Sequence, residues 1–250
     1  MLVTGHASVE ASPIELSARP SCLRREPLSF YRHSSEAMAT SRLSLGLFLL
    51  YSISTGIATG CVVKIRNRCP FSVTACSQTQ QQDIVQYDLR AGASQTVDLG
   101  ATCIWTAAVV YASVTGKCAV TGIPNAATDR NLANLAEFTI GSNGLDFYDL
   151  SNVNAYTIGM TISPSSESCK SVGCTIDDIS SFCQPNNVLL THLSGSQSCI
   201  NTDGTAGIGP TDSTKLWKSA CYDAYSYNFD DATSTFVCPT GTDYEVAFCP

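Results

Sequence analysis

Cysteine content is the feature of this 250-residue chain that most constrains its fold. Twelve of the thirteen cysteines lie at or after residue 61, at positions 61, 69, 76, 103, 118, 169, 174, 183, 199, 221, 238 and 249. An even number of cysteines behind a secretory leader is typical of disulfides formed in an oxidising compartment, so we expect six bridges. Twelve cysteines can pair in about ten thousand ways, so spacing alone does not give the connectivity.

The leader is an apolar run, LSLGLFLLYSISTGIA, that ends at Ala58, two residues before Gly60. It is short for a transmembrane helix and ends in small residues, so it resembles a secretory signal peptide. We assign residues 38–60 to this signal and expect an extracellular or cell-wall location. Residues 1–37 show no periodic pattern, and we interpret them as an unstructured or mis-assigned extension. The alternative is a genuine N-terminal arm ahead of an anchor.

The charge of residues 61–250 limits the partners, because 9 Lys and Arg stand against 17 Asp and Glu, a net charge of −8. This balance argues against nucleic acid and anionic membrane, so a membrane contact is unsupported. His192, the single histidine of this part, lies in LLTHLSG, which we interpret as a surface or loop segment. Without a CxxC motif we expect no metal site, no cofactor and no catalytic histidine. The length suits one sizeable core, and we expect a monomer.

Residues 61–164 and 222–250 consist mostly of short β-rich runs separated by Gly, Asn and Pro. Short strands at this spacing predict an all-β fold, an antiparallel sandwich or barrel. The first run, CVVKIRNRCPFSVTAC, is broken at Asn67–Pro70 and is typical of a hairpin. The open end of such a hairpin would bring Cys61 close to Cys76, so we expect a Cys61–Cys76 disulfide.

Residues 165–221 differ from the flanking segments because they are rich in Ser, Asn, Gly and Cys and poor in aromatic residues. Two stretches, CTIDDISSFC and STKLWKSAC, have the spacing of short helices, and Ser213 or Thr214 would cap the second. Such a segment buries little apolar surface, so disulfides worth about 2–4 kcal/mol each must supply much of its stability. We therefore expect a cysteine-rich subdomain of loops and short helices beside the sandwich.

One stretch, LAEFTIGSNGLDFYDLSNVNAYTIGM (135–160), carries the candidate functional residues. Glu137 and Asp149 stand among apolar and aromatic residues, with Asp146 between them and Asn154 shortly after. Two neighbouring carboxyl groups can serve as the acid and the base or nucleophile of a glycosidase. They can equally be solvent-exposed strand residues without chemistry.

The turn GSNG decides whether these two acids share a face of the sheet. If Ile140 pairs with Gly144, Glu137 and Asp149 are diagonal neighbours about 7–8 Å apart, within the range of an inverting glycosidase pair. If Gly141 pairs with Gly144 instead, Asp149 points to the opposite face. Both glycines can adopt positive φ, so the turn sequence alone leaves the two registers open.

Several stretches together resemble the thaumatin-like, pathogenesis-related proteins: VKIRNRCPFSV, the stretch at 135–164, SESCKSVGCTIDDI, GPTDSTKLWKSACYDAYSYNFDDATSTFVCP and YEVAFCP. The resemblance covers essentially all of residues 62–250, in the same order. It implies a flattened β-sandwich with a cysteine-rich subdomain beside it, and it favours the shared face for the two acids. It also implies five disulfides: Cys69–Cys249, Cys169–Cys238, Cys174–Cys221, Cys183–Cys199 and, from a less similar stretch, Cys103–Cys118.

The resemblance further implies an acidic cleft, which in the family is lined by one Arg, one Glu and three Asp. The family's cleft is linked to binding of β-1,3-glucans and, in some members, to their slow hydrolysis. By motif, Glu137, Asp149 and Asp223 match the Glu and two of the Asp residues. Asn154 stands at the third Asp, and Ala107 stands where the Arg should follow the sequence IW. Asparagine can hydrogen-bond a sugar hydroxyl but cannot act as a general base.

These residues support three hypotheses for function. The first is a secreted protein that binds β-1,3-glucan or a related cell-wall polysaccharide in the cleft, with an antifungal defence or wall-remodelling role. The second is a weak endo-β-1,3-glucanase with Glu137 as the acid and Asp149 or Asp223 as its partner. The third is a non-catalytic extracellular protein that acts by protein or membrane contacts. The replaced Arg and Asp favour the first and third. Four tyrosines beside the acids could stack on sugar rings: Tyr148, Tyr156, Tyr225 and Tyr227.

Overall fold

The computed structural model describes residues 60–79, 84–118, 129–183 and 185–250. The expected N-terminal extension and, apart from Gly60, the expected signal peptide lie outside these residues. Within the described ranges, none of the helices combines the length and the apolar character that a membrane crossing requires.

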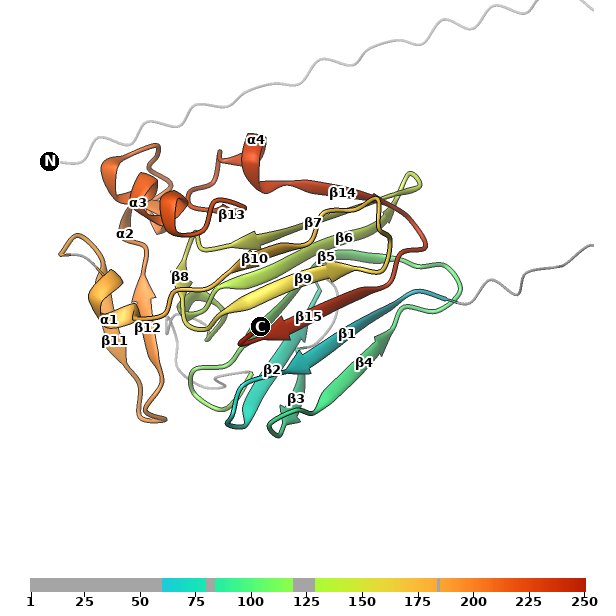
Figure 1. Cartoon of the computed structure of the whole chain (residues 1–250), viewed down its shortest axis with the longest axis horizontal. Helices are drawn as coiled ribbons and strands as arrows, with labels where there is room; N and C mark the ends of the chain where they lie inside the picture. Colours follow the sequence, from blue (N-terminus) through green and yellow to red (C-terminus); the bar gives the residue numbers. More distant parts are fainter. Residues whose placement is uncertain (1–59, 80–83, 119–128, 184) are drawn as a thin grey trace, which may run out of the picture. The chain divides into compact units, whose positions relative to one another are not determined.

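Two β-sheets packed face to face make up most of the described chain (Figure 1). The five-stranded sheet has the order β10 (Val172–Cys174), β9 (Met160–Pro164), β15 (Tyr244–Phe248), β1 (Val62–Asn67) and β4 (Ser94–Asp98). The second sheet has the order β13 (Ala224–Tyr225), β7 (Leu145–Ser151), β6 (Leu135–Ser142), β5 (Trp105–Ala112), β2 (Val73–Gln78) and β3 (Val85–Leu89), and β14 (Phe236–Pro239) also pairs with β7. Two of the pairs are parallel, β1 with β15 and β13 with β7, so the predicted all-β sandwich has mixed sheets.

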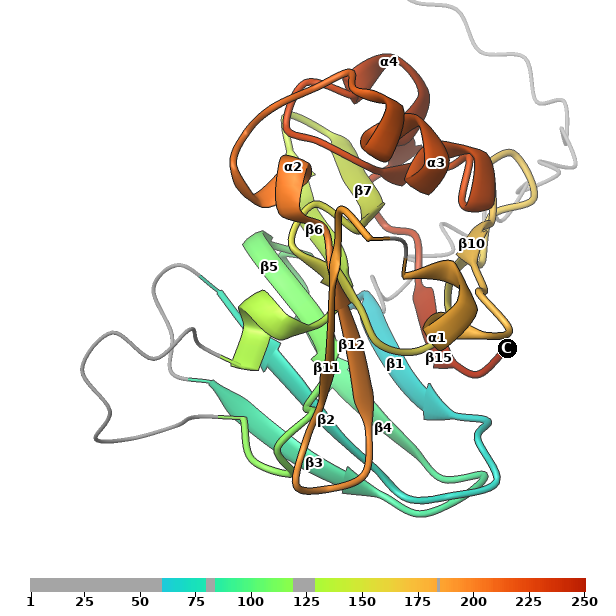
Figure 2. The same cartoon turned by 90° about the vertical axis from the view of Figure 1, so that its left-hand side faces the viewer.

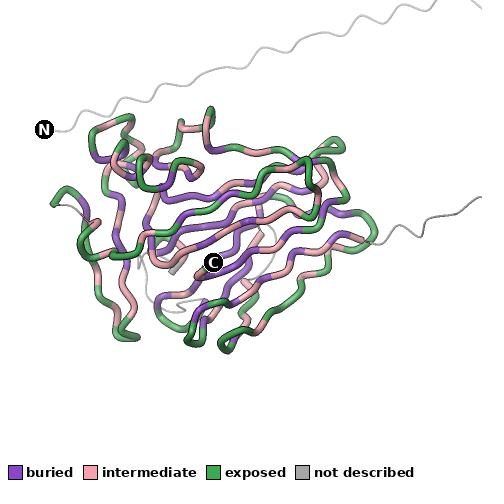
Figure 3. Tube along the Cα trace, viewed as in Figure 1, coloured by how far each residue is buried: buried purple, intermediate pink, exposed green. Residues whose placement is uncertain are grey.

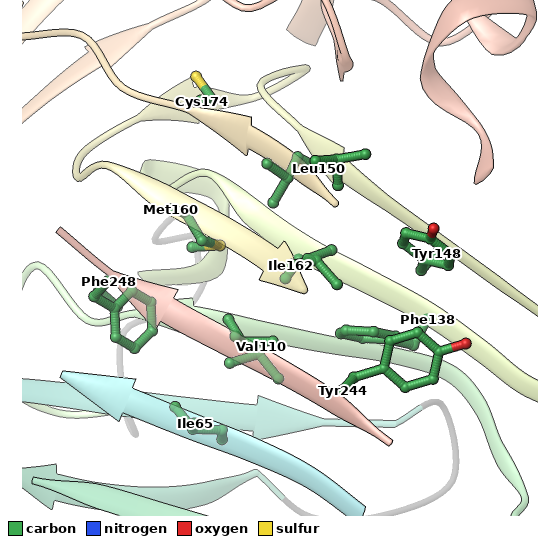
Figure 4. Packing of buried hydrophobic residues seen from close by; sticks show 14 of the residues in the cluster. Ile65, Val110, Phe138, Tyr148, Leu150, Met160, Ile162, Cys174, Tyr244 and Phe248 are labelled. Atoms are coloured by element: carbon green, nitrogen blue, oxygen red, sulfur yellow. The ribbon is translucent and has the colours of Figure 1, made fainter. Parts of the chain in front are cut away.

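The core lies between the two sheets and follows from alternation along the strands. In β1, Val63 and Ile65 are buried while Lys64 and Arg66 are partly exposed, the period of two that an extended strand imposes. Buried and less buried residues also alternate along β7 from Leu145 to Leu150 (Figure 3). Aromatic rings join the layers, since Phe138 of β6 packs edge-on against Tyr244 of β15 with ring centroids 5.5 Å apart (Figure 4).

The disulfide-rich part adds a small sheet and short helices (Figure 2). Its strands are β11 (Val188–Thr191), β12 (Gln197–Ile200) and β8 (Ala155–Tyr156), and its helices are α1 (Ile179–Phe182), α2 (Thr202–Thr205) and α3 (Asp212–Ala220). Both expected helices are present as α1 and α3. A buried Trp217 of α3 packs edge-on against Phe182 of α1, with centroids 4.8 Å apart. The expected boundaries of the cysteine-rich subdomain, residues 165 and 221, stay a prediction. The strand β10 lies inside these boundaries but belongs to the five-stranded sheet, and β8 lies outside them but belongs to the small sheet.

The cap of α3 corrects one expectation. Thr211 is the capping residue, in place of Ser213 or Thr214. Its hydroxyl accepts a hydrogen bond from the Thr214 amide at 3.1 Å, and the Thr214 hydroxyl accepts one from the Thr211 amide at 2.8 Å. This reciprocal arrangement satisfies two amides at the start of the helix, which is why the helix begins at Asp212.

Every cysteine in the described residues belongs to a disulfide. Four pairs agree with the resemblance: Cys69–Cys249, Cys169–Cys238, Cys174–Cys221 and Cys183–Cys199. The expected pairs Cys61–Cys76 and Cys103–Cys118 are wrong, because the structure joins Cys61 to Cys103 and Cys76 to Cys118. The predicted hairpin does not form, since β1 lies between β15 and β4 in one sheet and β2 lies between β5 and β3 in the other. Cys61 directly precedes β1 and Cys76 lies in β2, so the two cysteines adjoin different sheets.

Candidate functional site

Glu137 of β6 and Asp149 of β7 lie directly opposite each other across the sheet. Directly opposed residues have Cβ atoms about 4.5–5.5 Å apart and share a face. The shared face is therefore as expected, but the pair is a direct one. The diagonal register with a separation of about 7–8 Å is wrong.

The hairpin turn explains why both expected registers fail. Ser142 pairs with Leu145 across a two-residue turn in which Asn143 and Gly144 have φ of 54° and 80°. Positive φ at both central residues is the geometry of the type I′ turn, whose twist suits a hairpin. The register then shifts between Thr139 and Ser142, which brings Glu137 opposite Asp149.

Gly141 and Asp146 hold this register shift in place. Gly141 has φ of 81°, and a Cβ at this position would lie 2.4 Å from the carbonyl oxygen of Cys103. Its amide donates to Oδ1 of Asp146 at 2.9 Å. Asp146 is fully buried and also accepts from the hydroxyls of Thr240 and Tyr244, each at 3.0 Å. Asp146 therefore stabilises the hairpin from the core side, while Asp149 lies on the other face.

Two charged residues from distant segments lie beside the acid pair. Arg130 belongs to η1 (Asp129–Leu132), and its Nη2 lies 3.9 Å from Oε1 of Glu137. Asp231 begins α4 (Asp231–Ser234) and accepts a hydrogen bond from the Tyr225 hydroxyl at 2.7 Å. The negative charge of Asp231 acts on Asp149, so the pair has a cation beside one carboxyl group and an anion beside the other.

Burial and repulsion from Glu137 make Asp149 the carboxyl group of the pair with the more strongly raised pKa. Burial raises its pKa well above the usual value, and the charge of Glu137, the hydrogen bond with Glu137 and the charge of Asp231 raise it further. Its Oδ1 is buried and has no hydrogen-bond partner among the described residues. Burial also raises the pKa of Glu137, but Arg130 and hydrogen bonds from Ser151 and Asp149 oppose that effect. The two carboxyl groups are thus a hydrogen-bonded pair in which the pKa of Asp149 is raised the more strongly.

The pair stands where two hollows of the surface meet. Glu137 and Asp149 line both hollows, which measure about 330 and 320 Å³. Tyr225 and Asp231 line the first hollow. Arg130, Phe147 and Ala107 line the second.

A third hollow of about 580 Å³ lies between the loop before β2 and the tip of the β11–β12 hairpin, and its lining carries no charged side chain. We take the acidic hollows as the candidate site, because functional sites combine a concave surface with perturbed ionisable groups.

Two of the expected cleft residues lie outside these acidic hollows. Asp223 forms an ion pair with Lys170, with Nζ and Oδ1 2.6 Å apart, and lines neither hollow. Asn154 lines neither hollow, and its backbone carbonyl accepts a hydrogen bond from the Asn201 amide at 2.9 Å. Their role in ligand binding stays a prediction.

Among the four tyrosines, only Tyr225 lines a hollow of the acid pair. Tyr148 and Tyr156 are both buried, and alternation along β7 turns Tyr148 toward the core. Tyr227 is partly buried and packs against Gly209.

Sequence reasoning missed Arg130 and Asp231. Arg130 is the only basic residue between Lys117 and Lys170, which is a weak signal for a site within that segment. Asp231 follows Asp230 in NFDDATSTF, where two acids are typical of a helix start, so its sequence context favoured a structural role. Both residues come together with Glu137 and Asp149 only through the tertiary fold.

The fold and the site define a disulfide-bonded β-sandwich protein with a partly buried acid pair on one sheet face. The Thaumatin family model matches residues 67–250. Pathogenesis-related protein 5 of Arabidopsis thaliana is 34% identical over 243 residues, covering 83% of this chain and 98% of that protein. A thaumatin-like protein of Actinidia deliciosa is 34% identical over 229 residues, covering 83% and 97%. This chain therefore belongs to the thaumatin family.

Among solved structures, the thaumatin-like xylanase inhibitor TLXI superposes with a TM-score of 0.42 at 16% identity, covering 75% of this chain and 99% of that chain.

Proposed function

We propose that this protein is secreted and binds β-1,3-glucan or a related cell-wall polysaccharide at the Glu137–Asp149 pair. The observation that carries the proposal is a pair of directly opposed carboxyl groups at the junction of two hollows of more than 300 Å³ each. Hollows of this size lie at the lower end of the usual range for small-ligand sites. The similarity to a relative named for pathogenesis supports a role in defence.

The proton arrangement of the pair suits a sugar. Each sugar hydroxyl both donates and accepts, so neighbouring hydroxyls need one acceptor and one donor from the protein. Asp149, whose pKa is raised the more strongly, would supply the one O–H donor once a sugar hydroxyl replaces Glu137 as its acceptor, and Glu137 would then accept from the sugar. A hydrogen bond to an ionised acceptor is about twice as strong as a neutral one, so Glu137 would contribute most of the polar binding energy.

The same geometry favours binding over hydrolysis. Glycosidases place their two carboxyl groups about 5–5.5 Å apart when retaining and about 6.5–9.5 Å apart when inverting. Carboxyl groups that hydrogen-bond each other are closer than either arrangement and leave no room between them for a water or a glycosidic oxygen. If hydrolysis does occur, Asp149 with its higher pKa would be the acid, the reverse of the assignment from sequence.

Secretion is supported by the cysteines. All twelve cysteines of the described residues form disulfides. Such a dense set of bridges persists in oxidising compartments and is rare in the cytosol.

The test combines binding to an insoluble β-1,3-glucan with a reducing-sugar assay on a soluble one. We expect the wild type to sediment with the glucan and to release no sugar. Glu137→Gln should weaken binding about tenfold, because it removes the ionised acceptor. Asp149→Ala should weaken binding similarly, whereas Asp149→Asn should change it less than about threefold, because the amide keeps a donor.

Two further carboxylates serve as controls. Glu167→Gln removes one exposed negative charge and should leave binding unchanged. Asp223→Asn tests the residue that the sequence placed in the cleft, and we expect only a small effect. Equal binding by wild type and Glu137→Gln would contradict the proposal. Sugar release that Asp149→Asn abolishes would establish the glucanase instead.

A further inference from the structure

The second hollow offers two places from which a positive charge could approach Glu137. One is Ala107 of β5, where the resemblance leads us to expect an arginine, and which lines the hollow without any charge. The other is Arg130 of η1, which lines the same hollow and lies 3.9 Å from Oε1 of Glu137. The positively charged residue of this hollow is therefore Arg130 of η1, and β5 contributes the uncharged Ala107.

Arg130 is attached to the fold through the residues that follow it. The Thr157 hydroxyl donates to the carbonyl oxygen of Leu132 at 2.8 Å, at the end of η1. Asn134 accepts from the amide of Thr157 at 3.1 Å and donates to the carbonyl of Ile158 at 2.9 Å. These bonds fix the backbone of η1 against the segment after β8. The ion pair with Glu137 is half-exposed, with 38% and 33% of the two side chains accessible, so the arginine also remains open to a ligand.

The position of Arg130 makes the surroundings of the acid pair asymmetric. Each element packed around the pair supplies its own group: Asp149 from β7, Arg130 from η1, Asp231 from α4 and Tyr225 from β13. The cation lies beside Glu137, and Asp231 acts on Asp149. A nearby cation favours an ionised carboxyl group and a nearby anion favours a protonated one.

We infer that Arg130 fixes the negative charge of the pair on Glu137 and thereby keeps the proton, the only donor of the pair, on Asp149, where a ligand hydroxyl can replace Glu137 as its acceptor. Arg130 is a positioning residue in this role, because it acts through Glu137. The part of the inference that concerns the ligand rests on the proposed glucan binding. The part that concerns the proton does not, and it can be measured on the protein alone.

The test follows the side-chain carboxyl carbons of Glu137 and Asp149 by NMR while the pH of the ligand-free protein is changed. Arg130→Ala should raise the pKa of Glu137 toward that of Asp149, so that the two groups share the proton more evenly. Arg130→Lys should keep the pKa of Glu137 close to that of the wild type, because it preserves the charge. Arg90→Ala removes an exposed arginine elsewhere and should leave both titrations unchanged.

A charge relocation makes the test specific for the hollow. In Arg130→Ala combined with Ala107→Arg, the cation returns from β5, and the pKa of Glu137 should fall again. Recovery by this double variant excludes a general loss of structure as the cause of the Arg130→Ala effect. An unchanged titration of Glu137 in Arg130→Ala would overturn the inference.

Glucan binding by the same variants separates this inference from the proposed function. We expect Arg130→Ala to bind glucan about fivefold more weakly, because a partly exposed contact with a charged group contributes about that much. Arg130→Lys keeps the charge and should retain binding. If the titrations shift as expected but even the wild type fails to bind glucan, the proton assignment stands and the proposed function falls. If the wild type binds while Arg130→Ala titrates like it, the function stands and the inference falls.

Discussion

Asp146 and Asp149 are three residues apart on β7, yet the two faces of the strand give them opposite roles. Asp146 is fully buried on the core side and accepts hydrogen bonds from Gly141, Thr240 and Tyr244. Asp149 lies on the hollow side, where one oxygen is buried without a partner and its neighbour Glu137 is another acid. A buried carboxyl group with three donors stabilises a fold, whereas one with too few donors has a raised pKa. Burial alone therefore does not separate a structural acid from a functional one.

The largest effect is expected from Asp146→Ala. The substitution leaves the Gly141 amide and the hydroxyls of Thr240 and Tyr244 without their acceptor. Each donor left unpaired costs about 1–3 kcal/mol, less where water can reach it, so we expect a loss of about 3–5 kcal/mol of unfolding free energy. Urea denaturation measures this loss. A change below about 1 kcal/mol would remove the structural role assigned to the core face.

Gly141→Ala should have the next largest effect, because it affects the register shift that aligns the acid pair. A Cβ at Gly141 meets the Cys103 carbonyl oxygen at 2.4 Å, so the backbone must move. Gly144 has a similar φ of 80°, but a Cβ added there meets nothing within 4 Å, so Gly144→Ala costs only the strain of positive φ, about 1 kcal/mol. We expect Gly141→Ala to cost about 2 kcal/mol more than Gly144→Ala in urea denaturation. Equal losses would show that the close approach is unimportant.

Asp149→Asn should have the smallest effect on stability, and it should be favourable. The raised pKa of Asp149 means that its contribution is fully present below the usual value of 3.8 and is lost as the pH rises through the native pKa. The asparagine variant does not undergo this loss, so it should be more stable than the wild type by about 1 kcal/mol at pH 7.5 and not at pH 4. Thermal unfolding at the two pH values measures the difference. A variant that is less stable at pH 7.5 would mean that the charge of Asp149 stabilises the fold.

Much of the fold was accessible from sequence, because the signals were local. Alternation along β1 predicted which side chains enter the core, and the spacing of apolar residues predicted α1 and α3. The shared face of Glu137 and Asp149 was predicted from the family resemblance, because local alternation left two registers of the hairpin open. The register of the hairpin was not predictable from sequence, because one residue more or fewer in the turn changes which residues pair. The shift between Thr139 and Ser142 is such a change.

Local patterns in the sequence are enough to identify this chain as a cysteine-rich β-protein of the thaumatin type with two acids on one hairpin. The pairing of Cys61 with Cys103 and the approach of Arg130 to Glu137 came only from the three-dimensional fold. Strand formation depends on near neighbours, whereas the order of strands in a sheet depends on which surfaces bury each other across the core. Consecutive strands β1 and β2 entered different sheets for that reason, and the cysteine pairing and the charges around the acid pair followed from it.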